Sequence, residues 1–274
     1  MENKKKYKLF FSDLDHTLVV NNHIPSFNLE AIEKAKEKGV KFVLCTGRNF
    51  NIMNHLLKEI NTEDLENEYT ICNSGSTIYE NKNQRLLFFK EIDNEIIKMV
   101  FEYSKKLKDV IIIFDTLNIP FIFNDELIDK KRWQDFKYNP LKSLDDLKDS
   151  KIIRIILHTK DSDYLKKIQN DINNEKMFEG KISNYTSGPF LELNAFGVCK
   201  GEALKWLCNY LKVDIKETIA IGDDYNDESM LKEAGLGCCV KSANDDIKKV
   251  SKYICEKDYF EGSVKEVIEK FILN

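Results

Sequence analysis

The chain has 274 residues, of which 42% are hydrophobic and 32% are charged, and its formal net charge is -4 at pH 7. This composition is typical of a soluble globular protein rather than of a disordered or membrane chain. Basic and acidic residues alternate along stretches such as 30–38, so they form no basic patch of the kind that binds nucleic acid. No apolar run approaches the ~18 residues of a membrane span. We therefore expect neither a nucleic-acid nor a membrane partner.

Two features of the sequence bear on the cellular compartment. The basic residues 4–6 are followed by apolar residues only as far as Phe11, so the apolar core of a signal peptide is not formed. The seven cysteines contain no C-x-x-C pair, and most lie beside apolar residues, as buried thiols do in a reducing compartment. We expect a cytoplasmic protein that is a monomer or a small homo-oligomer.

The first section, residues 1–84, alternates strand and helix patterns. An apolar run ends at Phe11, a helical pattern extends from about Asn28 to Gly39, and residues 40–45 form a buried strand. Another strand is predicted over 69–72 and leads into the turn-forming residues 73–76. This alternation predicts a parallel sheet with helices on both faces.

The middle section, residues 85–189, has a different pattern. We predict a helix over 91–108, a hairpin from strands 110–114 and 119–123, a strand over 151–159, a helix over 162–173 and a strand over 181–185. Paired strands with packed helices indicate an antiparallel α+β unit of its own. Its edges are placed at the turn-rich stretches 81–84 and 187–189.

From residue 190 the alternation of strand and helix resumes. Strands are predicted over 191–193, 218–221 and 236–240, and helices over 200–211, from 227 onward and over 263–271. The two outer sections, 1–84 and 190–274, therefore form one doubly wound α/β core of parallel-sheet type. Residues 85–189 are an α+β domain inserted into that core.

Two clusters of acidic residues follow predicted strands. Asp13 and Asp15 end the first strand, and Asp223, Asn226 and Asp227 follow the strand over 218–221. Ligands of open α/β sheets lie beyond the carboxyl ends of the strands, and carboxylate oxygens are what Mg²⁺ prefers. Taken singly, the first pair could be an Asx turn and the second cluster a helix cap. Their coincidence favours a metal and phosphate site.

Two further segments carry groups that suit a phosphate. Thr46-Gly47-Arg48 follows the second strand, where a hydroxyl and free backbone N–H groups can bind phosphate oxygens. Lys200 begins a predicted helix and could offset the charge of a phosphorylated intermediate. Each alone has an ordinary explanation, namely a helix N-cap threonine and a solvated surface lysine.

Taken together and in this order, these segments resemble the haloacid-dehalogenase (HAD) superfamily and, within it, the Cof-type (subfamily IIB) phosphatases. The resemblance covers the whole chain. It rests on D-x-D-x-T-L from Asp13, T-G-R, an N-S-G turn, G-V-x-K-G at 197–201 and G-D-x-x-N-D at 222–227. Residues 261–264 are similar to the family's closing segment. The family's cap domain is inserted between the second and third motifs, which corresponds to residues 85–189.

The resemblance implies a role for each matching residue. Asp13 would be the nucleophile that becomes an aspartyl phosphate, and Asp15 would protonate the leaving oxygen and later activate water. The transferring phosphoryl group would be held by Thr46, Gly47 and Lys200. A Mg²⁺ cofactor would be held by Asp13, the backbone carbonyl of Asp15 and Asp223, with Asn226 and Asp227 close by, directly or through water.

One residue departs from the family pattern. The position after the second aspartate is usually glycine, and here it is His16. Histidine, asparagine and aspartate are the non-glycine residues that most often adopt positive φ, so we expect the same backbone with a side chain added. A metal-ligand role for His16 is disfavoured, because Mg²⁺ prefers oxygen.

The function predicted is hydrolysis of small phosphomonoesters, with sugar phosphates as the family's commonest substrates. Nucleotide, flavin and pyridoxal phosphates stay open, because specificity lies in the inserted domain, where Arg132, Trp133 and Arg154 are candidates for substrate contact. Two alternatives remain. One is a phosphomutase or phosphotransferase on the same fold, and the other is a catalytically silent binding module, against which the complete set of motif carboxylates argues.

Overall fold

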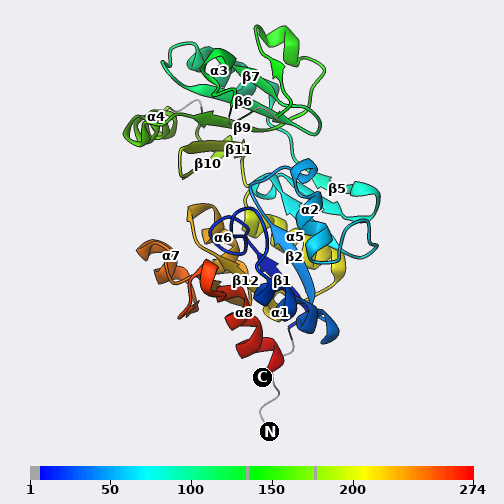
Figure 1. Cartoon of the computed structure of the whole chain (residues 1–274). Helices are drawn as coiled ribbons and strands as arrows, with labels where there is room; N and C mark the ends of the chain where they lie inside the picture. The colour runs from blue at the N-terminus through cyan, green and yellow to red at the C-terminus, as the bar shows by residue number, and fades with distance from the viewer. Residues whose placement is uncertain (1–6, 132, 134–135, 176–177) are drawn as a thin grey trace. The chain divides into compact units, whose positions relative to one another are not determined.

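The computed structural model describes residues 7–131, 133, 136–175 and 178–274 (Figure 1). The chain divides into two compact units. One consists of the residues up to Phe88 together with Cys199–Asn274, and the other consists of Phe89–Val198. The first unit is therefore built from two stretches of chain that are far apart in the sequence.

The first unit contains an eight-stranded sheet in the order β14-β13-β12-β1-β2-β3-β4-β5. Neighbouring strands run parallel from β14 to β3, and β4 is antiparallel to β3. In Figure 1 the blue N-terminal strand β1 lies beside the yellow to orange strand β12, which joins the two stretches of chain. The strands are β1 (Leu9–Ser12), β2 (Lys41–Cys45), β3 (Tyr69–Cys72), β4 (Thr77–Glu80), β5 (Arg85–Phe89), β12 (Thr218–Gly222), β13 (Leu236–Cys239) and β14 (Tyr253–Ile254).

The central strands β12, β1 and β3 are buried along their whole length, and β2 is buried from Phe42 onward. Every residue of β1 is buried, and Phe10 stacks on Phe42 of β2 with ring centroids 5.1 Å apart. Burial on both faces explains why these strands are continuous apolar runs. The helices of the unit are α1 (Ser26–Glu37), α2 (Asn54–Glu59), α5 (Lys200–Leu211), α6 (Glu228–Glu233), α7 (Asp245–Val250) and α8 (Ser263–Ile268).

The second unit contains a six-stranded sheet in the order β10-β11-β9-β6-β7-β8. All its pairs are antiparallel except β7 with β8. The strands are β6 (Ile111–Thr116), β7 (Phe121–Phe123), β8 (Asn139–Pro140), β9 (Ile152–His158), β10 (Ile182–Ser187) and β11 (Phe190–Ala195), and the helices are α3 (Asn94–Ser104) and α4 (Ser162–Asn174). The apolar faces of α3 and α4 bury Val100, Phe101 and Ile168 in one cluster with Phe114 and Leu157 of the sheet.

The doubly wound α/β core and the α+β unit agree with the sequence analysis, but two strands lie in the other sheet. Residues 191–193 were expected in the core, yet they belong to β11, which pairs with β9 and β10. Residues 85–89 were expected in the inserted domain, yet β5 is the edge strand of the first sheet. Both are short apolar segments, and only their hydrogen-bonding partners decide which sheet they join. Among the described residues, no helix combines the length and apolarity needed to cross a bilayer.

Candidate active site

The polar residues singled out in the sequence meet at one edge of the first sheet. Asp13 follows β1, Thr46 follows β2 and Asp223 follows β12. Because Ser12 is in register with Leu44 of β2 and Ile221 of β12, the three parallel strands end together. The carboxyl edge of the sheet therefore delivers these side chains to one place, as expected for an open α/β sheet.

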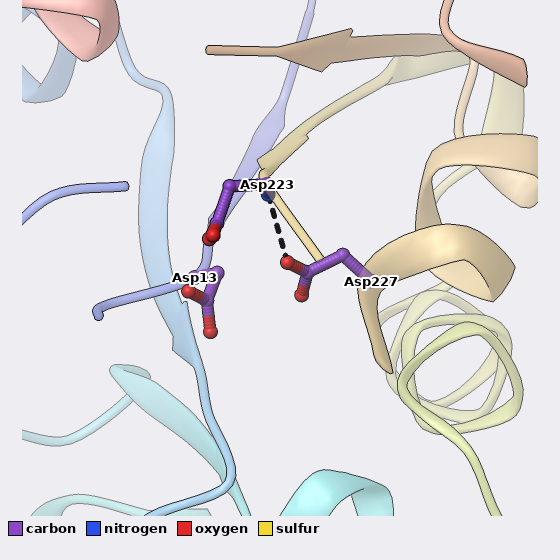
Figure 2. Close-up of side chains that lie close together, drawn as sticks. All are labelled: Asp13, Asp223 and Asp227. Atoms are coloured by element: carbon purple, nitrogen blue, oxygen red, sulfur yellow. Dashed lines mark hydrogen bonds between the residues drawn. The ribbon is translucent and has the colours of Figure 1, made fainter. Parts of the chain in front are cut away.

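Three carboxylates gather at this edge. One oxygen from each of Asp13, Asp223 and Asp227 lies within 4.8 Å of the others. Figure 2 shows the three side chains converging from the end of β1, the end of β12 and the turn that precedes α6. Asp13 and Asp227 are buried, and Asp223 is partly buried. Such a cluster can hold a hard divalent cation.

Lys200, the first residue of α5, partly neutralises these charges. Its side chain is completely buried, and its Nζ donates to Oδ1 of Asp13 at 2.5 Å and to Oδ1 of Asp227 at 2.6 Å. Burial alone would lower the pKa of Lys200, but the two carboxylates hold that pKa well above its usual value. The lysine is therefore a permanent cation beside Asp13.

One lysine does not balance three acids. Burial and the nearby Asp227 carboxylate raise the pKa of Asp13, although Lys200 opposes that rise. Burial, followed by the charges of Asp13 and Asp227, also raises the pKa of Asp223. The Thr17 hydroxyl donates to Oδ1 of Asp223 at 2.8 Å. The site thus carries an excess of negative charge that a divalent cation would relieve, so its donor set fits Mg²⁺.

Asp227 differs from the other two acids because both of its oxygens are occupied. Oδ1 accepts from Lys200, and Oδ2 accepts from the backbone N–H groups of Asp223 at 2.9 Å, drawn in Figure 2, and Asp224 at 3.2 Å. A Cβ at Gly222 would lie 2.4 Å from Cγ of Asp227. Gly222 is therefore needed because any side chain there would occupy the space in which the Asp227 carboxylate accepts from the backbone of Asp223 and Asp224.

Thr46 is buried and held by the turn over 73–75. Its carbonyl oxygen accepts from Ser74 N at 3.0 Å, and its Oγ1 accepts from Arg48 N at 3.1 Å. Gly75 has φ +99°, and a Cβ there would lie 2.4 Å from the carbonyl oxygen of Cys199. The N-S-G turn thus packs tightly against the residue before Lys200, which fixes Thr46 and the start of α5 near each other.

Asp15 does not join the three clustered carboxylates. Its side chain is 56% exposed and accepts two hydrogen bonds from Arg48, from Nε to Oδ2 at 3.0 Å and from Nη2 to Oδ1 at 2.6 Å. His16, the next residue, has φ +59°, which confirms the positive φ expected from the sequence. Its ring meets Tyr259 edge-on, with centroids 5.4 Å apart.

Gly47 and Asn226 are the remaining residues predicted for the site. Both are partly exposed, and Asn226 lies in the 225–227 turn beside the cluster. Thr17 and Arg48 were given no role from the sequence, although the motifs D-x-D-x-T-L and T-G-R contain them. Thr17 contacts Asp223 and Arg48 contacts Asp15. These contacts follow only from the fold, because the spacing of residues along the chain does not show which group a hydroxyl or a guanidinium will meet.

Three residues of the inserted domain were candidates for substrate contact, namely Arg132, Trp133 and Arg154. Arg154 is buried and pairs with Asp115 at 2.6 Å and Glu192 at 3.1 Å, so its charge is compensated inside that unit. The Trp133 ring lies 6.1 Å from that of His158. Arg132 lies outside the described residues.

Known proteins resemble the chain over most of its length. The model of the haloacid dehalogenase-like hydrolase family matches residues 10–268. A phosphoglycolate phosphatase of Methanobrevibacter smithii is 31% identical over 268 residues, 95% of this chain and 97% of the relative. A 5-amino-6-(5-phospho-D-ribitylamino)uracil phosphatase of Bacillus subtilis is 26% identical over 262 residues, 95% of this chain and 94% of the relative.

The fold of this chain is also similar to that of a solved structure. A haloacid dehalogenase-like hydrolase from Bacteroides thetaiotaomicron superposes with a TM-score of 0.79 at 27% identity, over 97% of this chain and 99% of that one. The resemblance drawn from the motifs is thereby confirmed. The chain belongs to the haloacid dehalogenase-like hydrolases and is a phosphatase of that type.

Proposed function

We propose that the chain hydrolyses small phosphomonoesters in two steps through an aspartyl phosphate on Asp13, with Mg²⁺ as cofactor. The observation that carries this proposal is the contact of buried Asp13 with Lys200 beside Asp223, at the carboxyl ends of three parallel strands. The two relatives described above are named as phosphatases of small phosphorylated metabolites. Sugar phosphates or related phosphorylated metabolites are therefore the substrate class proposed.

The metal would be held by oxygen ligands of the first unit. We assign this role to the carboxylates of Asp13 and Asp223 and the backbone carbonyl of Asp15, with Asn226 close by. When bound, Mg²⁺ would neutralise the charge of the phosphoryl oxygens and of the nucleophile. Both oxygens of Asp227 already accept hydrogen bonds within the protein. Its role in this scheme is to hold Lys200 and the 222–227 loop in place.

In the first step a carboxylate oxygen of Asp13 attacks phosphorus and the ester P–O bond breaks. Asp15 gives its proton to the departing alkoxide, so that the alcohol leaves neutral. Thr46, Gly47 and Lys200 hold the phosphoryl oxygens during the transfer, which is mainly a matter of positioning and charge neutralisation.

In the second step water hydrolyses the aspartyl phosphate. Asp15, now a carboxylate, accepts a proton from the water that attacks phosphorus, and the bond from phosphorus to Asp13 breaks. Inorganic phosphate leaves, and both aspartates return to their starting states. We assign the second unit the role of a cap, which excludes water during the first step and selects the leaving group.

The test is release of inorganic phosphate from a panel of phosphorylated metabolites with Mg²⁺ and with EDTA. Asp13→Asn removes the charged oxygen that attacks phosphorus, so activity should fall by more than about a hundredfold, equivalent to ~3 kcal/mol in barrier. Asp64→Asn, an exposed acid of the same unit paired with Lys82, is the matched control and should keep its activity.

Three results would contradict the proposal. Full activity in EDTA would exclude the metal, and activity of Asp13→Asn above a hundredth of wild type would exclude covalent catalysis by this residue. Transfer of the phosphoryl group to a sugar hydroxyl without release of phosphate would identify a phosphomutase instead.

A further inference from the structure

Asp15, the proposed general acid, is bound to Arg48 through both of its carboxylate oxygens. Nε of Arg48 lies 3.0 Å from Oδ2 and Nη2 lies 2.6 Å from Oδ1. This is the two-pronged geometry in which a guanidinium binds a carboxylate most strongly. While both oxygens accept from Arg48, Asp15 is a carboxylate with no proton to give, so it must leave Arg48 and take up a proton from water before it can act as the acid. The pair must therefore open during each turnover.

The partner that moves is Asp15. Arg48 is anchored at several points, since Nη1 donates to Oδ1 of Asn22 at 2.5 Å, its backbone N donates to Thr46 Oγ1, and its carbonyl oxygen accepts from Asn73 N at 3.0 Å. The Arg48 side chain is only 18% exposed, whereas that of Asp15 is 56% exposed. When the pair opens, Arg48 stays where it is and Asp15 leaves it.

Opening the pair leaves the Arg48 guanidinium without its carboxylate, on a side chain that is only 18% exposed. Because little of that side chain reaches water, solvent replaces the lost carboxylate only in part, and opening the pair has a cost. A neutral hydroxyl would not restore the balance, whereas a second carboxylate would. An anion supplied by the substrate would therefore release Asp15 at little cost.

On the basis of the function proposed above, we propose that Arg48 exchanges the Asp15 carboxylate for an anionic group on the leaving part of the substrate. The preferred substrates are then small phosphomonoesters whose leaving alcohol carries a carboxylate. In this scheme Arg48 does two things. It binds the substrate anion, and it positions Asp15 by holding that carboxylate until the anion arrives.

The first experiment compares 3-phosphoglycerate with glycerol 3-phosphate on the full-length wild-type protein with Mg²⁺. The two esters differ only in a carboxylate that replaces a hydroxymethyl group. We expect kcat/KM to favour 3-phosphoglycerate by at least about tenfold, the effect of one charge-assisted pair. Part of the preference should lie in kcat, because the anion frees the general acid as well as binding.

Substitutions of Arg48 test whether this residue causes the preference for 3-phosphoglycerate. Arg48→Gln should bring the ratio of the two kcat/KM values to within about threefold of one, and Arg48→Lys, which keeps the charge without the fork, should restore part of it. Arg85→Gln is the matched control, since Arg85 is an exposed arginine of the same unit paired with Glu80. It should leave the ratio at its wild-type value.

The outcomes separate this inference from the proposed function. A wild-type ratio near one, or a ratio unchanged in Arg48→Gln, overturns the anion preference. A preference confined to KM shows that Arg48 binds the carboxylate without releasing Asp15, and overturns the exchange. In either case Asp13-dependent hydrolysis of p-nitrophenyl phosphate would leave the proposed function standing, whereas its failure would remove both.

Discussion

Asp13 and Asp15 are separated by one residue, yet their surroundings are opposite. Asp13 is buried and contacts the Lys200 ammonium, while Asp15 is mostly exposed and contacts Arg48. Asp13 follows the strand directly, whereas Asp15 precedes the positive φ of His16, where the chain turns. A buried, fixed carboxylate suits an attacking nucleophile, and an exposed one suits an acid that must reach a leaving group.

This difference gives a prediction for Asp15→Asn. A sugar alkoxide is a poor leaving group that needs a proton, whereas p-nitrophenolate needs far less help. The variant should therefore lose much more of its phosphorylation rate with a sugar phosphate than with p-nitrophenyl phosphate. Because the base of the second step is also missing, the aryl ester should give a burst of p-nitrophenol followed by a stall.

Rapid-mixing kinetics with both esters measure these effects. Asp13→Asn is the control, since without the nucleophile no burst can form. Equal losses for the two leaving groups, with no burst from Asp15→Asn, would mean that Asp15 acts only through the loop or the metal.

At the scale of elements, the site depends on a contact between helix α5 and two loops. Lys200 at the start of α5 joins the end of β1 through Asp13 and the 225–227 turn through Asp227. Asp227 can take this position only because Gly222 leaves room for its side chain. The arrangement of the loop after β12 is therefore coupled to the position of the lysine.

Gly222→Ala tests this coupling. The added Cβ would lie 2.4 Å from Asp227 Cγ, so Asp227 must move and loosen its hold on Lys200. We expect a fall of ~1 to 3 kcal/mol in the free energy of unfolding, as for other overpacked sites. Phosphatase activity should fall by at least about tenfold, since small misplacements of binding groups are costly.

Gly39→Ala is the matched control for that experiment. Gly39 has φ +83°, but a Cβ at this position would have no atom within 4 Å, so alanine there adds backbone strain without a clash. It should lose about 1 kcal/mol of stability and keep its activity. Equal activity in the two variants would show that the Asp227 contact does not matter for catalysis.

At the scale of the whole molecule, the chain has separate hydrophobic cores in its two units. One cluster includes Phe10, Phe42 and Leu204, and another includes Phe101 and Leu193. The second unit also contains the buried ion triad of Arg154 with Asp115 and Glu192. Separate cores allow the two units to open with different free energies.

Arg154→Met should therefore destabilise the second unit selectively. Removing the cation takes the Arg154 ion pairs away from two buried carboxylates, a change that costs ~3 to 5 kcal/mol. Hydrogen exchange read by peptide should accelerate across β6, β9 and β11 and stay near wild type in β1 and β12. Lys105→Met, which removes an exposed i,i+3 pair at the C-terminal end of α3 in the same unit, should cost less than ~1 kcal/mol. Equal acceleration in both units would show that they unfold as one.

The sequence by itself determined the α/β class, most elements and the candidate residues at the strand ends. The helix over 200–211 has the predicted bounds, because an apolar face and a following turn are local signals. His16 was expected at positive φ because it stands where the family usually has glycine and because histidine tolerates that backbone, and the structure has φ +59° there. Asp13, Thr46 and Asp223 follow parallel strands, so their meeting at one edge was also predictable.

Only the tertiary structure decided which partners these residues have. Residues 85–89 joined the eight-stranded sheet and residues 190–195 joined the six-stranded sheet, the reverse of what was expected. The sequence of a short apolar strand does not indicate which strands it pairs with. The contacts of Lys200 with Asp227, and of Arg48 with Asp15, join residues that are 27 and 33 positions apart. Spacing along the chain cannot encode such pairs, since they form only when separate strands and loops pack together.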